Sequence, residues 1–178
     1  MRAKLAAAVV AAMALSSQSP ALAQTASAVP ATPQHANAQE QAPNALLGAW
    51  KVDLGRSKYG GAAPKNNIRT FSYTQDGKLL VTSISLGATG RKSMLHWAVQ
   101  LDGSPSPEFT DYNGSTPSSV VGLKKQDETT LVLTVWKHGK VTLTGSFKLS
   151  PDGETLTYAY GATGGENVIV YKRWDMAG

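Results

Sequence analysis

The feature that most constrains this chain is a set of short runs in which apolar and polar residues alternate. The clearest run is residues 140–149, where Val141, Leu143 and Phe147 lie on one side and polar residues fall between them. A repeat of two residues is the side-chain period of a β-strand, so this run is typical of a strand with one buried face. Gly145 falls on the apolar side, where a missing side chain suits a bend or a close approach.

Similar runs recur through most of the chain, and helix signals are scarce. Turn residues separate the runs, and Asp76-Gly77 predicts a hairpin with a type I′ turn, because glycine accepts the positive φ that this turn requires. Residues 105–117 contain three prolines, which favours an edge segment or an open loop there. We predict strands over residues 68–74, 78–86, 91–101, 120–126, 130–136, 140–149, 154–160 and 167–174.

The predicted strands follow one another closely, which makes an all-β fold of about eight to ten consecutive antiparallel strands. Such a meander must hide its edge strands, and closure into an up-and-down barrel is the simplest way to do so. A two-sheet sandwich is the alternative. An outer-membrane barrel has the same period, but Lys124, Lys148 and Lys172 interrupt faces that lipid would have to wet.

Residues 1–23 have the features of a secretion signal. Arg2 and Lys4 precede an apolar run from Leu5 to Leu15, and Ala21-Leu22-Ala23 is a small-x-small cleavage site. The apolar run is shorter than the roughly 20 residues that a membrane-spanning helix needs, so we expect no transmembrane anchor. We expect cleavage after Ala23 and a periplasmic or secreted product.

The rest of the chain divides into a linker and one domain. Residues 24–45 are rich in alanine, proline and glutamine without apolar periodicity, which indicates a disordered linker that includes His35. Residues 46–178 are enough for one core, and we expect a monomer. The chain has no cysteine, which excludes disulfides and sulfur-based zinc sites. The net charge of +5 is scattered, which argues against nucleic acid as a partner.

Two short segments carry a resemblance to a known family. Gly48-Ala49-Trp50 opens the predicted domain, and Arg173 lies in Val170-Tyr171-Lys172-Arg173-Trp174 near its end. The pair resembles the first signature of lipocalins and other calycins, and the late turn 150–153 is similar to one in exported bacterial proteins with a lipocalin-like domain. The resemblance implies that Trp50 plugs the closed end of a barrel under the Arg173 guanidinium, a structural pairing, and that the cup binds a small, mostly apolar molecule.

Aromatic residues on the predicted strands are the candidates for contact with such a ligand, because ligand cavities are mostly apolar with a few orienting polar groups. These candidates are Trp97, Trp136, Phe147, Tyr158 and Tyr160.

An enzyme is an alternative, and a non-catalytic envelope interaction or inhibitor module is another. An isomerase, cyclase or lyase would use His96 in the cup with a rim carboxylate, Glu108 or Asp111. No metal site or cofactor is expected, because the histidines lack ligand spacing and the chain has no phosphate-binding or dinucleotide fingerprint.

Overall fold

The computed structural model describes residues 41–111, 116–162 and 165–175. These residues form one short 3-10 helix and ten strands that close into a barrel, and every pair of neighbouring strands is antiparallel. The signal segment 1–23 and the linker up to residue 40, with His35, lie outside the described residues. The elements are η1 (Asn44–Leu46), β1 (Gly48–Val52), β2 (Asn66–Tyr73), β3 (Leu79–Leu86), β4 (Lys92–Val99), β5 (Ser106–Thr110), β6 (Ser119–Lys125), β7 (Thr130–Lys137), β8 (Lys140–Leu149), β9 (Thr155–Ala162) and β10 (Gly165–Arg173).

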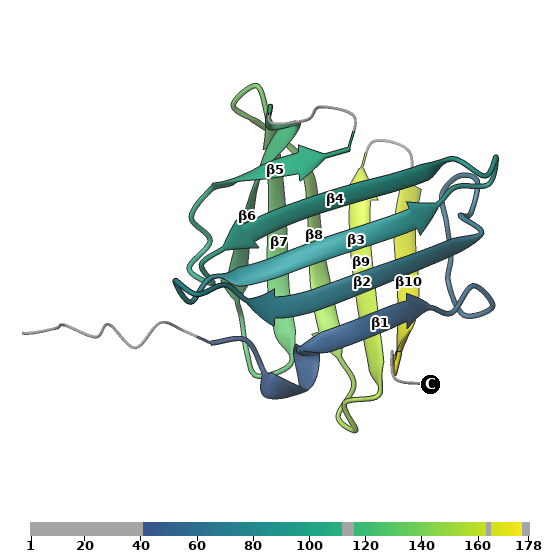
Figure 1. The fold of residues 1–178 in the computed structure, drawn as a ribbon, viewed down its shortest axis with the longest axis horizontal. Coiled ribbons are helices and arrows are strands. Elements are labelled where there is room, and N and C mark those ends of the chain that lie inside the picture. Colours follow the sequence, from purple (N-terminus) through teal and green to yellow (C-terminus); the bar gives the residue numbers. More distant parts are fainter. Residues whose placement is uncertain (1–40, 112–115, 163–164, 176–178) are drawn as a thin grey trace, which may run out of the picture. The chain divides into compact units, whose positions relative to one another are not determined.

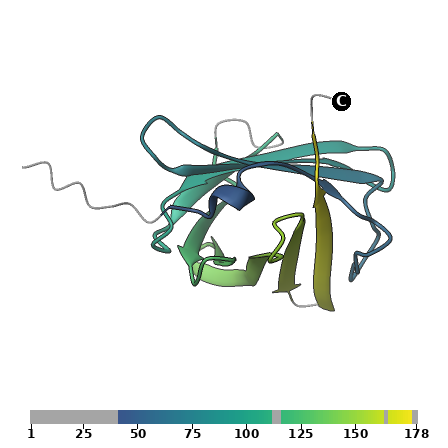
Figure 2. The ribbon, with the colours of Figure 1, turned by 90° about the horizontal axis from the view of Figure 1, so that it is seen from below.

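The barrel has the up-and-down topology expected from the strand runs. Its strand order is β1-β10-β9-β8-β7-β6-β5-β4-β3-β2, so only the β1–β10 contact joins strands that are distant in sequence. Strands β1 to β4 lie in front in Figure 1, and β7 to β10 lie behind them and run at a steep angle to them. Figure 2 shows these two groups as layers on either side of the interior. The sandwich alternative is wrong, because the sheet is continuous around the barrel.

Trp50 and Arg173 form the seam between the first and the last strand. They are direct partners in the β1–β10 register, and the Arg173 guanidinium lies 4.4 Å from the centroid of the indole. The guanidinium donates to the carbonyl oxygens of Ala45, Leu47 and Gly153, and Trp50 Nε1 donates to Leu46 O at 2.8 Å. This is the contact that the resemblance implied, and it joins both strands to the segment around η1.

The end of the barrel near Trp50 is closed by the chain before β1. Leu46 in η1 is buried, Ala42 is buried as well, and the Ala42 amide donates to the Tyr73 hydroxyl at 2.7 Å. Figure 2 shows η1 lying across the space between the two layers. The folded body therefore includes residues 42–45, which the sequence analysis had placed in the linker. An alanine-rich stretch gives no periodic signal, so the burial of Ala42 could not be read from the sequence.

The hairpins differ in one respect from the prediction. Gly77 has a φ of 78°, but Asp76 has no positive φ, and Gly77 N donates to Thr74 O at 3.0 Å. Residues 74–78 therefore form a type I turn with a glycine bulge rather than a type I′ turn. The positive φ values of a type I′ turn occur instead at His138 (51°) and Gly139 (74°), between β7 and β8. The hairpin itself was predicted correctly at both places.

The proline-rich segment was also assigned incorrectly in part. Residues 106–110 are strand β5, which lies between β4 and β6 rather than at an edge or in an open loop. Its ladders are short, with two residue pairs to β4 and three to β6. A short ladder tolerates Pro107 because few amide donors are required there.

Side chains in the turns explain three of the aspartates. Asp102 Oδ1 accepts from Ser104 N and Oγ, and Asp152 Oδ1 accepts from Ser150 Oγ and Glu154 N. The carboxylate of Asp76 is 2.7 Å from Lys78 Nζ. These hydrogen bonds hold the pKa of each carboxyl below its usual value. The three residues stabilise turns and are not drawn into a site.

Candidate functional site

A cavity of about 390 Å³ opens inside the barrel at the end away from Trp50. It lies between the inner faces of β2, β3 and β4 on one side and of β9 and β10 on the other, and the loop between β1 and β2 covers part of it. The other half of the interior is filled by fully buried side chains, which are Trp50, Phe71, Leu79, Val81, Val99, Val121, Leu123, Leu131, Phe147 and Leu156. Among the described residues, the open space therefore lies in the half away from Trp50.

The loop over the cavity is held against β10. Ser57 Oγ accepts from the amide of Val170 at 2.9 Å, Lys58 forms a bridge with Val168, and the Gly60 amide donates to Asn167 Oδ1 at 2.9 Å. These contacts place Tyr59 on the cavity wall. Burial raises the pKa of Tyr59 against the lowering effect of the nearby Ser57 side chain, and within the described residues the buried hydroxyl has no hydrogen-bond partner.

Tyr158 and Tyr160 form one wall of the cavity, and Phe147 continues their stack into the packed interior. Phe147 and Tyr158 are stacked with ring centroids 4.4 Å apart, and Tyr158 and Tyr160 are stacked at 4.6 Å. Gly145 makes this stack possible, because a Cβ atom there would lie 2.7 Å from Ala159 O and 2.8 Å from the Cβ of Tyr160. The close approach expected at Gly145 is therefore present, and it brings β9 tightly against β8.

Polar side chains line the opposite wall. The Tyr171 hydroxyl donates to Asn67 Oδ1 at 2.8 Å, and Asn67 Nδ2 donates to Ser83 Oγ at 3.0 Å and to Ile84 O at 3.2 Å. This network joins β10, β2 and β3 across the interior. Because its members satisfy one another, it fixes the shape of the polar wall.

Arg69 lies below this network, one inward position deeper on β2 than Asn67. It is 7% exposed, and its guanidinium carbon lies 4.7 Å from the Tyr158 ring centroid and 5.0 Å from that of Phe147. Its Nε is buried without a hydrogen-bond partner. Tyr59 Oη and Arg69 Nε are the buried side-chain polar atoms that lack partners among the described residues, and both residues line this cavity.

The aromatic candidates from the sequence fall into three groups. Tyr158 and Tyr160 line the cavity. Trp97 and Phe147 are buried in the packed interior and are not part of the cavity lining. Trp136 lies on the outer face, where its ring covers Gly122, because the inward positions of β7 are Leu131, Leu133 and Val135. The site thus contains two of the five candidates.

The structure does not bring the catalytic candidates together. His96 is exposed on the outer face of β4, stacked on Phe109 with ring centroids 5.5 Å apart. Glu108 is half-buried, and its carboxylate accepts from Ser119 Oγ at 2.6 Å, whereas Asp111 is exposed after β5. Across the described ranges, no group of three or more histidine, cysteine or acidic residues could hold a metal ion. The enzyme hypothesis has no assembled acid–base pair in its favour.

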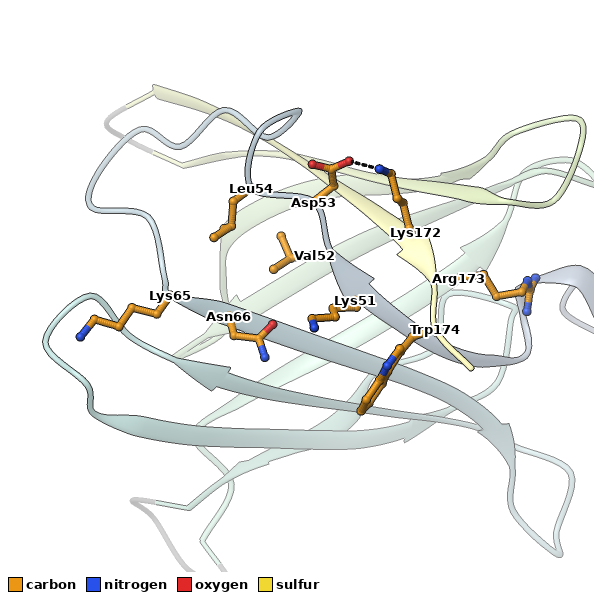
Figure 3. Close-up of a pocket in the computed structure, with 9 residues that line it drawn as sticks. All are labelled: Lys51, Val52, Asp53, Leu54, Lys65, Asn66, Lys172, Arg173 and Trp174. Carbon is orange, nitrogen blue, oxygen red and sulfur yellow. Dashed lines mark ion pairs between the residues drawn. The ribbon is translucent and has the colours of Figure 1, made fainter. Parts of the chain in front are cut away.

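A second hollow, of about 530 Å³, lies on the outside of the barrel across β1 and β10 (Figure 3). Lys51 and Lys172 face each other there, and Lys172 Nζ is 2.8 Å from the Asp53 carboxylate. Both lysines point outward, since their neighbours Trp50 and Tyr171 are buried. This groove offers exposed charges without a buried polar group that needs a partner, so the interior cavity is the better candidate.

Comparisons with known proteins support the fold. No family model matches the sequence, and the search of curated proteins finds no match. The solved structure of the fluorescent protein UnaG matches with a TM-score of 0.51 at 16% identity, over 72% of this chain and 96% of UnaG. A mutant of UnaG matches with a TM-score of 0.52 at 16% identity, over 74% and 97%. A Schistosoma mansoni fatty acid binding protein in complex with arachidonic acid gives 0.47 at 12% identity, over 76% and 100%.

The match to UnaG shows a shared fold. The chain is a calycin-like barrel of ten antiparallel strands, as the resemblance at Gly48-Ala49-Trp50 and Arg173 implied. Within the described residues, no helix has both the length and the apolar character needed to cross a membrane.

Proposed function

We propose that this barrel binds a small, mostly apolar molecule in the half of its interior that is not filled by side chains. The observation that carries the proposal is the cavity of about 390 Å³ between the wall formed by Tyr158 and Tyr160 and the polar wall around Asn67. Its volume lies in the range of small-molecule sites, which are concave, mostly apolar and equipped with a few orienting polar groups. Tyr160, Leu95 and Ile169 supply apolar surface, while Asn67 and Ser83 supply the polar wall.

The proposal is tested by filling the cavity. Ser85 faces the cavity from β3, and Ser72 on β2 is exposed on the outer face. Ser85→Trp is expected to weaken binding of the neutral apolar dye Nile red by about tenfold or more, a loss of about 1.4 kcal/mol, because the indole occupies the space of the guest. Ser72→Trp adds the same side chain outside and is expected to leave binding unchanged. Fluorescence titration measures both, and equal affinity of Ser85→Trp and wild type would exclude the cavity as the binding site.

The chemical class of the guest is found by competition against the same dye. Fatty acids, isoprenoids and aromatic metabolites form the panel. The enzyme alternative is not favoured, because His96 faces solvent while Glu108 accepts from Ser119. The interaction-module alternative stays a prediction, which stoichiometric capture of a protein partner would support.

We also propose that the protein is exported and acts in the periplasm or outside the cell. The support is the basic start, the apolar run and the Ala21-Leu22-Ala23 site of residues 1–23. Mass spectrometry of the protein from the periplasm or the medium is expected to give a chain that begins at Gln24. Ala23→Arg is expected to block processing, because the cleavage site requires a small residue. A full-length wild-type chain confined to the cytoplasm would contradict export.

A further inference from the structure

Arg69 is a buried cation that forms no ion pair within the part of the chain that the structure describes. Arginine stays protonated in proteins, and burying a cation is unfavourable unless it is paired. Among the described residues no carboxylate forms an ion pair with Arg69, and no hydrogen bond from its guanidinium is present. The guanidinium instead lies against the rings of Phe147, Tyr158 and Tyr171, with centroid distances of 5.0, 4.7 and 5.8 Å.

The neighbouring groups do not neutralise this charge. Burial raises the pKa of Tyr158, so that its hydroxyl stays neutral despite the opposing effect of Arg69. Asn67 and Tyr171 satisfy each other. Glu108, on β5, is close enough to Tyr158 to raise the pKa of its hydroxyl, but it forms no ion pair with Arg69, and its Oε1 accepts from Ser119 at 2.6 Å and from Ser118 at 3.4 Å. The aromatic faces attract the cation but offer no acceptor for its N–H groups.

The N–H donors therefore need an acceptor from the cavity that Arg69 lines. We propose that Arg69 is the anion-binding residue of the cup and that the guest is an amphiphile with a carboxylate head. A guanidinium offers paired N–H groups that match the two oxygens of a carboxylate. The buried hydroxyl of Tyr59, which also lines the cavity and lacks a partner, is a second donor for the same guest. This inference rests on the proposed function, since it assigns the head group of the molecule bound there.

The position of Arg69 also fixes the orientation of the guest. Asn67 is nearer to the cavity mouth than Arg69 on β2, and Phe71 continues into the filled half. A head group on Arg69 therefore lies at the floor of the cavity, above Phe147 and Tyr158. The apolar part of the guest then extends toward Leu95, Tyr160 and Ile169, so the anion enters first and the chain follows.

The test uses two competitors of the same chain length, decanoate and decan-1-ol, each displacing Nile red from the full-length protein at neutral pH. Wild type is expected to bind decanoate about tenfold or more tightly than the alcohol. Arg69→Met keeps a long side chain without charge and is expected to remove this preference while Nile red still binds. Arg69→Lys keeps the charge but loses the paired donors, and an intermediate preference is expected. Lys51→Met removes one positive charge from the outer face and is expected to behave as wild type.

The outcomes separate the two proposals. Equal affinity of wild type for acid and alcohol, or an unchanged preference in Arg69→Met, overturns the role of Arg69 and leaves binding in the cup intact. Failure of wild type to bind Nile red, the acid or the alcohol overturns both. Loss of the acid preference in Lys51→Met places the anion in the outer groove and also overturns the role of Arg69.

Discussion

Trp50→Ala is expected to lower the free energy of unfolding by about 3–5 kcal/mol, the range for truncation of a buried tryptophan. The side chain is 0% exposed, and its removal opens a cavity at the closed end. It also leaves Leu46 O without the indole donor and removes the ring beneath the Arg173 guanidinium. A domain of this size has a total stability of about 5–15 kcal/mol, so the variant loses a large part of it.

Denaturant unfolding followed by circular dichroism measures this change without depending on tryptophan emission. Trp174→Ala is the matched control, because Trp174 is partly exposed beyond the end of β10. Its expected loss is under about 1 kcal/mol, as for surface substitutions. If the two variants were equally stable, the indole at the seam would not stabilise barrel closure.

The fold could be predicted to a large extent because its signals are local. Alternation in residues 140–149 gave β8 with the same bounds, and turn residues located the hairpins. Closure depends on one long-range pairing, and no local pattern shows it. The resemblance around Trp50 and Arg173 supplied that pairing, which the β1–β10 register confirms.

The site was harder to predict because alternation shows which residues face inward, but not whether the space around them is open or whether a polar group there has a partner. Arg69 shares its alternation with Phe71 and Tyr73, so the sequence already placed it among inward residues. The absence of a buried partner is a property of the whole barrel and cannot be seen from one strand. Trp136 was predicted as a ligand contact because it is an aromatic residue on a strand, although the inward Leu133 and Val135 already direct it to the outer face.

His96 lies on the outer face of β4, and the alternation of that strand explains why. Its neighbours Leu95 and Trp97 face inward, so the alternation of β4 directs the imidazole outward. The hypothesis that it lines a cavity required the second face of β4 to be enclosed as well. In a single barrel only one face is enclosed, and the stacking of His96 on Phe109 occurs on the outer face.

The second large effect, that of Arg69→Met on the free energy of unfolding, is expected to be opposite in sign to that of Trp50→Ala. Arg69→Met is expected to raise the free energy of unfolding of the ligand-free protein by about 1–2 kcal/mol, since a buried cation loses several kcal/mol of hydration and gains less from the ring contacts. The unbranched methionine fills a similar path between Phe147 and Tyr158 and leaves no donor unpaired. Denaturant unfolding of both proteins without ligand measures the difference.

The two proteins are then expected to respond differently to decanoate. A guest that binds only the folded state stabilises it in proportion to the logarithm of its concentration relative to its Kd. Wild type therefore gains stability with decanoate, whereas Arg69→Met gains little, and the stability difference between them narrows as decanoate is added. Lys51→Met, which changes an exposed lysine, is expected to stay within about 0.5 kcal/mol of wild type. A ligand-free Arg69→Met that is less stable than wild type would mean that the rings alone stabilise the cation, and the barrel would then have no need of an anionic guest.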